Sequence, residues 1–209
     1  MKNYFAALLA LLFFAGSFAF PVQAGQESSK APQIKLLEDV TLKKLTKAEE
    51  PAEQHRMLST LSGTWHYNLQ YWTDENAEAQ TSSGLMTNEM VLGEKFLSSK
   101  TVLIINAGGQ NIPYEGWGLL GYDAAKKVFT SVWADRGQVG MITATGKYNA
   151  ETKTIEEKGS FTHPLLEKEQ TYRSELQFTE NDTYKRTIFI VGASGKEFKV
   201  LEAAFSRHQ

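Results

Sequence analysis

The stretch Gly63-Thr64-Trp65-His66-Tyr67-Asn68-Leu69-Gln70-Tyr71-Trp72 decides the fold class. Large apolar side chains alternate with polar ones along it, and a period of two residues is typical of a half-buried β-strand. Gly63 allows the backbone to bend tightly at the start of the strand. A large aromatic residue such as Trp65, placed directly after this bend, can plug the end of a β-barrel.

The same period continues to the C-terminus and predicts an all-β fold of about ten strands. The predicted strands are Thr64–Thr73, Thr81–Val91, Phe96–Asn106, Glu115–Tyr122, Val128–Ala134, Val139–Tyr148, Thr154–Thr162, Gln170–Thr179, Tyr184–Val191 and Glu197–Arg207. Short connectors rich in Gly, Asn and Asp separate them. This pattern favours an antiparallel up-and-down barrel, because closure removes exposed strand edges. A two-sheet sandwich is the competing architecture.

A short helix is predicted ahead of the first strand, over residues 49–61. Pro51 suits a first-turn position and acidic residues crowd the N-terminal end. Met57, Leu58 and Leu61 form an apolar face, and Gly63 ends the helix. We expect this helix to cap one end of the barrel.

The first 24 residues predict a secretory signal peptide. Lys2 supplies a positive charge, Phe5–Phe20 is almost wholly apolar, and Val22-Gln23-Ala24 fits a small-residue cleavage site. A membrane anchor is the alternative, but it needs about 20 apolar residues. We therefore expect a signal peptide over 1–24, a flexible leader over 25–48 and a barrel domain over 49–209. The absence of cysteine excludes attachment through a lipidated cysteine, and export without disulfides suits a bacterial periplasm.

The composition excludes some partners. The net charge is −2, and no cluster of Lys and Arg is dense enough to indicate nucleic acid or an anionic membrane surface. Aromatic residues make up 11% of the chain, which suits either a filled core or the wall of an apolar pocket. The sequence predicts no stable membrane span once the signal peptide is cleaved.

Five sequence strings together resemble a bacterial family of calycin-like proteins that is known only as domain of unknown function 1579. They are Gly63-Thr64-Trp65, Val91–Leu97, Pro113–Asp123, Trp133-Ala134-Asp135 and Gly195–Glu202. Gly-X-Trp alone is the signature of calycins, the superfamily of lipocalins and fatty-acid-binding proteins, and the Pro113–Asp123 string is more specific. The resemblance covers Glu50 to Arg207. It implies a calycin-type barrel and leaves the activity open.

The string around Trp117 offers a first candidate site. Alternation places Glu115 and Trp117 on one face of the strand and Gly116 and Gly118 on the other. If Glu115 and Trp117 point inward, they supply one polar contact within an aromatic wall. The alternative is structural, since glycines on a strand also permit close approach of an aromatic side chain or sharp curvature.

A second candidate is an ion pair between Arg173 and Glu202. Alternation puts Glu202 on the face of Phe198 and Val200, where a buried carboxylate needs a partner. Arg173 is the candidate cation, because a guanidinium pairs with a carboxylate in bidentate fashion. An interior pair could anchor the polar end of a ligand, as interior arginines do in fatty-acid-binding barrels. The alternative is an ordinary pair at the barrel rim.

Other residues complete the candidate set. Trp65, Tyr67, Glu115, Trp117, Trp133, Arg173 and Glu202 are the predicted ligand-binding residues of the interior wall. Asp135 fits a turn better than a ligand contact. The four histidines are scattered without metal-site spacing, so the sequence predicts no metal and no cofactor, haem included.

Three functions are compatible with these features. The leading hypothesis is an exported barrel that binds a small apolar or amphipathic ligand in its interior. The second is an enzyme in which Glu115 or Glu202 acts as acid or base beside Arg173. The third is a non-catalytic structural or interaction barrel with a filled core. No nucleophile elbow or catalytic triad order occurs, so enzymatic activity stays undecided.

Overall fold

The computed structural model describes residues 50–107, 110–163, 167–180 and 182–208. The predicted signal peptide over 1–24 and the predicted leader over 25–48 lie outside the described residues. Among the residues that are described, no helix combines the length and the hydropathy of a membrane-crossing segment.

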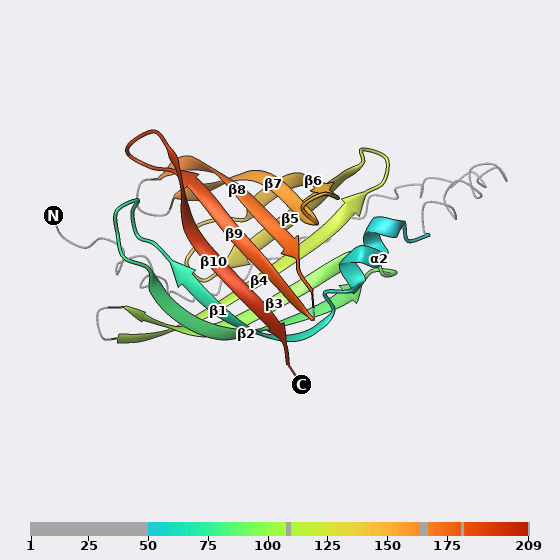
Figure 1. The fold of residues 1–209 in the computed structure, drawn as a ribbon, viewed down its shortest axis with the longest axis horizontal. Helices are drawn as coiled ribbons and strands as arrows, with labels where there is room; N and C mark the ends of the chain where they lie inside the picture. Colours follow the sequence, from blue (N-terminus) through green and yellow to red (C-terminus); the bar gives the residue numbers. More distant parts are fainter. Residues whose placement is uncertain (1–49, 108–109, 164–166, 181, 209) are drawn as a thin grey trace, which may run out of the picture. The chain divides into compact units, whose positions relative to one another are not determined.

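Ten antiparallel strands form a closed barrel in which each strand pairs with its neighbours in the sequence and β1 pairs with β10 (Figure 1). The strands are β1 (Gly63–Tyr71), β2 (Gln80–Val91), β3 (Phe96–Ala107), β4 (Gln110–Asp123), β5 (Val128–Asp135), β6 (Ile142–Asn149), β7 (Thr154–His163), β8 (Lys168–Phe178), β9 (Thr183–Val191) and β10 (Glu197–Arg207). The predicted up-and-down barrel is therefore confirmed, and the sandwich is excluded.

The predicted strands agree with the observed ones to within two residues at each end, except near two turns. β4 starts at Gln110 rather than Glu115 and includes Pro113, which pairs with Ile104 of β3. β6 starts at Ile142 rather than Val139, because the turn after β5 is longer than predicted. Proline usually marks a strand end or edge, and this is why the first part of β4 is hard to recognise.

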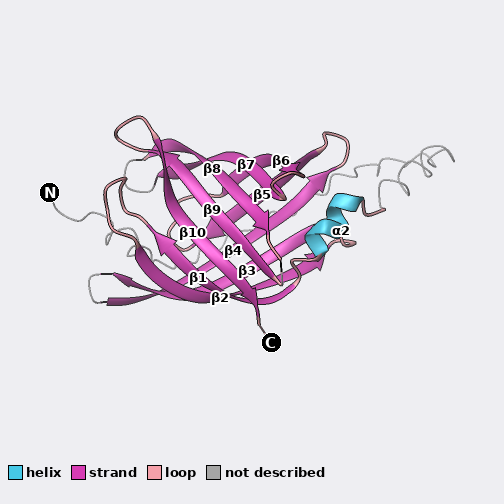
Figure 2. Cartoon of the chain, viewed as in Figure 1, coloured by secondary structure: helices cyan, strands magenta, loops and turns pink. Residues whose placement is uncertain are grey.

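Helix α2 (Glu53–Ser59) precedes β1 and lies at one end of the barrel (Figure 2). Leu58 on α2 and Leu61 after it belong to the hydrophobic core, as predicted. The helix is shorter than the predicted 49–61, and Pro51 lies before it rather than in its first turn. We call the end of the barrel that carries α2 the helix end and the opposite end the far end.

His55 fastens α2 to the barrel. Its Nδ1 atom accepts a hydrogen bond from the backbone N–H of Ala52 at 2.8 Å. Its Nε2 atom lies 3.1 Å from the carbonyl oxygen of Tyr122 near the end of β4 and donates to it, since Nδ1 is the acceptor. The side chain is buried, and it therefore both starts the helix and docks it.

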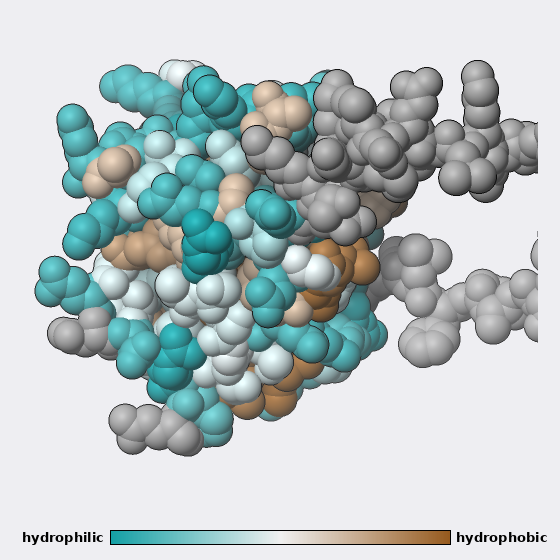
Figure 3. Space-filling view, turned by 90° about the vertical axis from the view of Figure 1, so that its right-hand side faces the viewer, coloured by the Kyte–Doolittle hydropathy of each residue, from teal (hydrophilic) through white to brown (hydrophobic). Residues whose placement is uncertain are grey.

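The interior at the helix end is filled by side chains. Trp65 and Tyr67 of β1, Phe129 of β5, Ile155 of β7 and Phe205 of β10 are all buried in one core. Figure 3 views the molecule from this side, where hydrophilic side chains in teal are interspersed with white ones and with several separate hydrophobic groups in brown. Burial of aromatic and aliphatic side chains here supplies the main stabilisation of the fold.

The first and last strands close the barrel around Gly63. Its backbone has φ +118°, a conformation that favours glycine, and a Cβ atom at this position would lie 2.8 Å from Nη1 of Arg207. The Arg207 guanidinium lies over the Trp65 ring, 4.2 Å from its centroid. The Trp65 indole donates to the carbonyl oxygen of Leu61 at 2.8 Å. The predicted plug is thus held by a cation above it and a backbone carbonyl beside it.

A β-bulge interrupts β10. The pairing with β9 shifts between Lys199 and Leu201, so that Val200 is an extra residue. Phe198 pairs with the inward-facing Ile190 of β9, whereas Glu202 pairs with Thr187 on the outer face. Phe198 and Glu202 therefore lie on opposite faces, and the prediction that they share one is wrong.

Candidate functional site

Ionisable and hydroxyl side chains from three adjacent strands meet inside the barrel. We call Glu157 of β7, Tyr172 and Ser174 of β8 and Arg186 of β9 the inner polar cluster. Glu157 pairs with Ser174 across the β7–β8 ladder, and Arg186 pairs with the buried residues Leu176 and Ala203. Because paired residues of neighbouring strands share a face of the sheet, all four side chains lie on the inner face.

Arg186 and Glu157 form the ion pair of this cluster. Nη1 of Arg186 lies 3.1 Å from Oε2 of Glu157 and donates to Oγ of Ser174 at 2.9 Å. Glu157 is 1% exposed and Ser174 is fully buried. A charge at this depth is costly unless it is paired, and Arg186 supplies the pairing.

Tyr172 responds to the buried carboxylate. Burial, followed by the negative charge of Glu157, raises the pKa of Tyr172 to about 12, while Arg186 acts in the opposite direction. The phenol therefore stays protonated at neutral pH. It is a neutral hydroxyl group beside a charge pair.

The exposure of Arg186 indicates that there is accessible space inside the barrel next to this cluster. Its side chain is 30% exposed although it points into a closed barrel and its two partners are buried. Other inward-facing residues towards the far end are also only partly buried, among them Leu69, Ile188 and Leu201. An inward side chain of a closed barrel is exposed only to the interior, so the interior is less densely filled here than at the helix end.

A second group of polar side chains lies on the inner face nearer the far end. Oδ2 of Asp135 accepts from Nε1 of Trp133 at 3.0 Å, and Oδ1 accepts from the backbone of Gly137 at 2.7 Å. Tyr114 bonds to both Trp133 and Asp135, and burial is the main cause that raises its pKa. Asp135 thus forms the predicted turn and also orients two aromatic side chains of the interior.

Of the predicted interior residues, Trp65, Tyr67 and Trp133 point inward. Trp65 and Tyr67 are part of the filled core, where Tyr67 shares a hydrogen bond with Thr101 at 2.7 Å. Trp133 lies against Gly116 and Gly118 of β4, where added Cβ atoms would meet its ring at 2.4 and 2.5 Å. The glycines of β4 therefore serve close approach of an aromatic ring, which was the structural alternative for this strand.

Glu115 and Trp117 lie on the outer face, so their predicted place in the interior is wrong. Glu115 pairs with Lys100 at 3.1 Å, and both side chains are more than half exposed. Trp117 is 44% exposed and donates to Oγ of Ser98 at 3.0 Å. The predicted alternation is correct, but the face with the glycines is the inner one because Trp133 occupies the space above them.

The predicted pair of Arg173 with Glu202 does not form, and both residues lie on the outer face. Arg173 lies over the ring of Phe189 and pairs with Glu197 and Glu175. The hydrogen bond to Glu197 is the largest cause that raises the pKa of Arg173, and the bond to Glu175 acts in the same direction. The hydrogen bond from Arg173 in turn lowers the pKa of Glu197.

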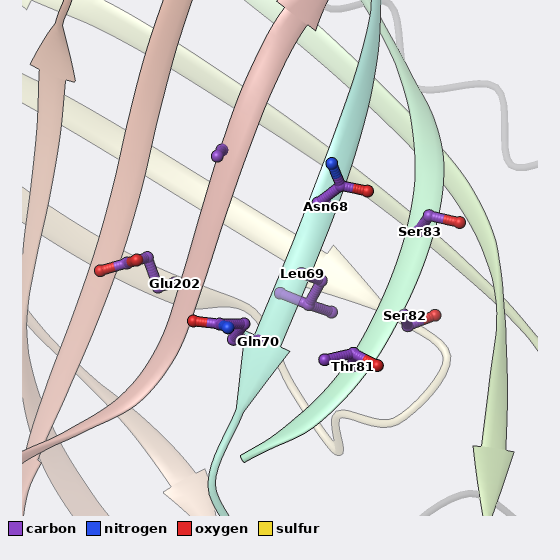
Figure 4. A pocket seen from close by; sticks show the side chains of 8 residues that line it. Asn68, Leu69, Gln70, Thr81, Ser82, Ser83 and Glu202 are labelled. Atoms are coloured by element: carbon purple, nitrogen blue, oxygen red, sulfur yellow. The ribbon is translucent and has the colours of Figure 1, made fainter.

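Glu202 instead pairs with Lys199 at 3.0 Å, and Lys199 also lies over the ring of Trp72. Glu202 borders a shallow outer hollow formed by β1, β2 and β10 (Figure 4). Hydroxyl residues of β2 line it on one side, and the other lining residues are Asn68, Leu69, Gln70 and Ala204. It lies outside the barrel, and Glu202 has no place in the inner polar cluster.

Sequence reasoning missed the inner polar cluster, although its pattern is visible in the sequence. The period of two places Glu157 on the same strand face as Ile155 and Phe161. It likewise places Arg186 on the same face as Tyr184 and Ile188. A charged residue on the apolar face of each of two nearby strands, with opposite signs, is the signal that identifies them. Among the described residues, no three His, Cys, Asp or Glu side chains come together in a way that could hold a metal ion.

Comparison with known proteins identifies a family and a fold. The family model described as "Protein of unknown function (DUF1579)" matches residues 50–207. No curated protein matches the sequence.

Two solved structures have a similar fold. Rv2717c from M. tuberculosis is 16% identical, with a TM-score of 0.57, and the match covers 77% of this chain and 100% of that one. The S-type phycobiliprotein lyase CPES from Guillardia theta is 11% identical, with a TM-score of 0.51, and the match covers 78% of this chain and 97% of that one. At these identities the likeness concerns the barrel fold alone.

Proposed function

The chain belongs to the DUF1579 family of proteins of unknown function, and on this premise we propose that its barrel binds a small amphipathic molecule in the interior. The polar end of the molecule contacts the inner polar cluster, and its apolar part extends towards the far end. Leu69, Ile188 and Leu201 line this path.

The observation that carries this proposal is the exposure of Arg186 inside a closed barrel. A barrel designed only for stability gains little from an interior ion pair, since well-packed apolar residues of similar volume do as well or better. Known small-molecule sites combine apolar walls with a few convergent polar groups. The Arg186–Glu157 pair, with Ser174 and Tyr172 beside it, has this composition.

The fold relatives support the coarser idea that such a barrel engages another molecule. One of them is named a phycobiliprotein lyase. Its low identity indicates no particular substrate for this chain, so the ligand class has to be argued from the residues of the interior.

We also propose that the barrel acts after export, in the periplasm or outside the cell. The positive Lys2, the apolar run of Phe5–Phe20 and the small residues up to Ala24 support cleavage of a signal peptide after Ala24. Sequencing of the N-terminus of the protein recovered from the periplasm tests this, and a chain that retains residues 1–24 contradicts it.

Binding can be tested with the neutral probe N-phenyl-1-naphthylamine, whose fluorescence rises in an apolar site. We expect saturable binding by the wild-type protein and at least tenfold weaker binding by Ile188→Trp, because the added ring occupies the interior. Val102→Trp is the matched control, since Val102 is exposed on the outer face of β3. Absence of probe binding, or equal loss in both variants, contradicts the proposal. Native mass spectrometry of the protein expressed in the periplasm then looks for a co-purified small molecule.

A further inference from the structure

Glu157 has one carboxylate oxygen without a donor. Its Oε2 atom receives the hydrogen bond from Arg186, whereas no group among the described residues donates to Oε1. The side chain is 1% exposed, so bulk water does not solvate this oxygen. A buried unsatisfied acceptor is rare in native proteins and calls for a donor.

Arg186, in contrast, has N–H donors for which the described residues offer no acceptor. A guanidinium has five N–H donors, and among the described residues only Nη1 has hydrogen-bond partners, namely Glu157 and Ser174. Nε and Nη2 therefore have N–H groups to offer. The exposed part of Arg186 faces the interior, so these donors are accessible to a molecule bound there.

The charges of the cluster cancel. Glu157 is negative, Arg186 is positive, and the neighbouring Tyr172 and Ser174 are neutral hydroxyl groups at neutral pH. An anionic ligand group would add a second negative charge beside Glu157, and a cationic group would add a second positive charge beside Arg186. Like charges repel strongly where water is excluded.

We infer that the polar end of the ligand is an uncharged group that both donates and accepts hydrogen bonds, as an alcohol or a primary amide does. It accepts from Arg186 and, once a small rotation of the Glu157 side chain exposes Oε1, it donates to that oxygen. This inference rests on the proposed interior site and narrows its ligands to neutral amphipathic molecules. Carboxylates, the ligands expected for a barrel with an unpaired interior arginine, are disfavoured.

The experiment measures displacement of bound N-phenyl-1-naphthylamine by three ligands that are each built on a linear chain of ten carbon atoms. We expect 1-decanol to displace the probe at a concentration about tenfold lower than decyl methyl ether, which cannot donate, and than decanoate, which is charged. A tenfold change is the lower limit expected for one hydrogen bond to an ionised group.

The variant Glu157→Gln tests the role of the charge balance. Arg186 then has no anionic partner, so the order of ligands is expected to reverse, with decanoate displacing the probe better than 1-decanol. Glu156→Gln is the matched control, because Glu156 directly precedes Glu157 in β7 and lies exposed on the outer face. The order in this control should equal that of the wild-type protein. If Glu157→Gln fails to fold, the wild-type series alone decides.

The two proposals fail in different ways. If the probe binds but the three ligands displace it equally, or decanoate displaces it best from the wild-type protein, the inference about the polar group is wrong and the interior site stands. The inference is equally wrong if the folded Glu157→Gln variant keeps the wild-type order. If the probe does not bind at all, the interior site itself is wrong, and the inference falls with it.

Discussion

The guanidinium of Arg207 lies 4.2 Å from the centroid of the Trp65 ring and joins the end of the last strand to the start of the first. The same guanidinium donates to the carbonyl oxygens of Ser62 at 2.7 Å and Thr60 at 3.1 Å. It therefore satisfies the backbone that follows α2 while it covers the aromatic plug.

Replacement of Arg207 should destabilise the barrel at its closure. Arg207→Ala removes the cation above Trp65 and leaves two carbonyl groups without their donor, which costs about 2–3 kcal/mol of the free energy of unfolding. Urea denaturation followed by tryptophan fluorescence measures this. Asp182→Asn is the control, because it removes only the exposed partner of Arg207 and should cost less than about 1 kcal/mol. Equal effects of the two variants would show that the stacking contributes nothing.

Gly63→Ala should be destabilising for two reasons. The residue has φ +118°, and its new Cβ atom would lie 2.8 Å from Nη1 of Arg207. We expect a loss of about 1–3 kcal/mol. Gly140→Ala is the matched control, since nothing lies within 4 Å of a Cβ atom there, and its effect should stay within about 0.5 kcal/mol. Thermal unfolding of both variants in parallel gives the comparison.

Replacement of His55 should release α2 from the barrel. His55→Ala leaves the N–H of Ala52 and the carbonyl oxygen of Tyr122 without their partners, and it removes a buried ring. The expected loss is about 2–3 kcal/mol, with faster amide exchange along the helix. Gln54→Ala on the same helix is the control. Unchanged amide exchange of α2 in His55→Ala would contradict the docking role.

The buried ion pair should show strong coupling. Arg186→Leu leaves Glu157 charged and unpaired in the interior, which costs about 3–5 kcal/mol. The double variant Glu157→Leu/Arg186→Leu should recover most of this loss, because no charge remains buried. A double-mutant cycle of unfolding free energies measures the coupling. Additive effects of the two single variants would mean that the pair does not interact.

The barrel should lose stability at alkaline pH. Burial raises the pKa of five tyrosines above the ordinary value of 10.0, namely Tyr67, Tyr71, Tyr114, Tyr172 and Tyr184. Above pH 10 the unfolded chain releases these protons while the folded chain retains them, so stability falls as pH rises. Absorbance at 295 nm and circular dichroism should therefore change together above pH 10. Ionisation of all tyrosines near pH 10 with an intact circular dichroism spectrum would contradict this.

The strands and the topology could be predicted from the sequence because the evidence for them is local. The alternation from Trp65 onward and the turn residues between strands gave the number and order of the strands. The predicted range for β4 starts too late, because a proline such as Pro113 usually marks a strand boundary. In the structure Pro113 lies within the strand and pairs with Ile104.

The face of each strand that points inward was harder to predict from the sequence than the strands themselves. On β4 both faces carry aromatic residues, and only the contact of Trp133 with Gly116 and Gly118 identifies the inner one. On β10 the extra residue Val200 breaks the alternation, so that Phe198 gives no guide to Glu202. Such choices depend on the neighbouring strand, and no single strand contains the information.

The pairing of β1 with β10 also bears on the order in which the chain can fold. A barrel closed by its first and last strands cannot be completed until the residues of β10 have been synthesised and released from the ribosome. Until then, both edges of the growing sheet remain open to pairing with other chains. Contacts between residues distant in sequence also form slowly. A chaperone that shields the edge of β1 until β10 arrives would therefore raise the yield of folded protein more than it would raise its final stability.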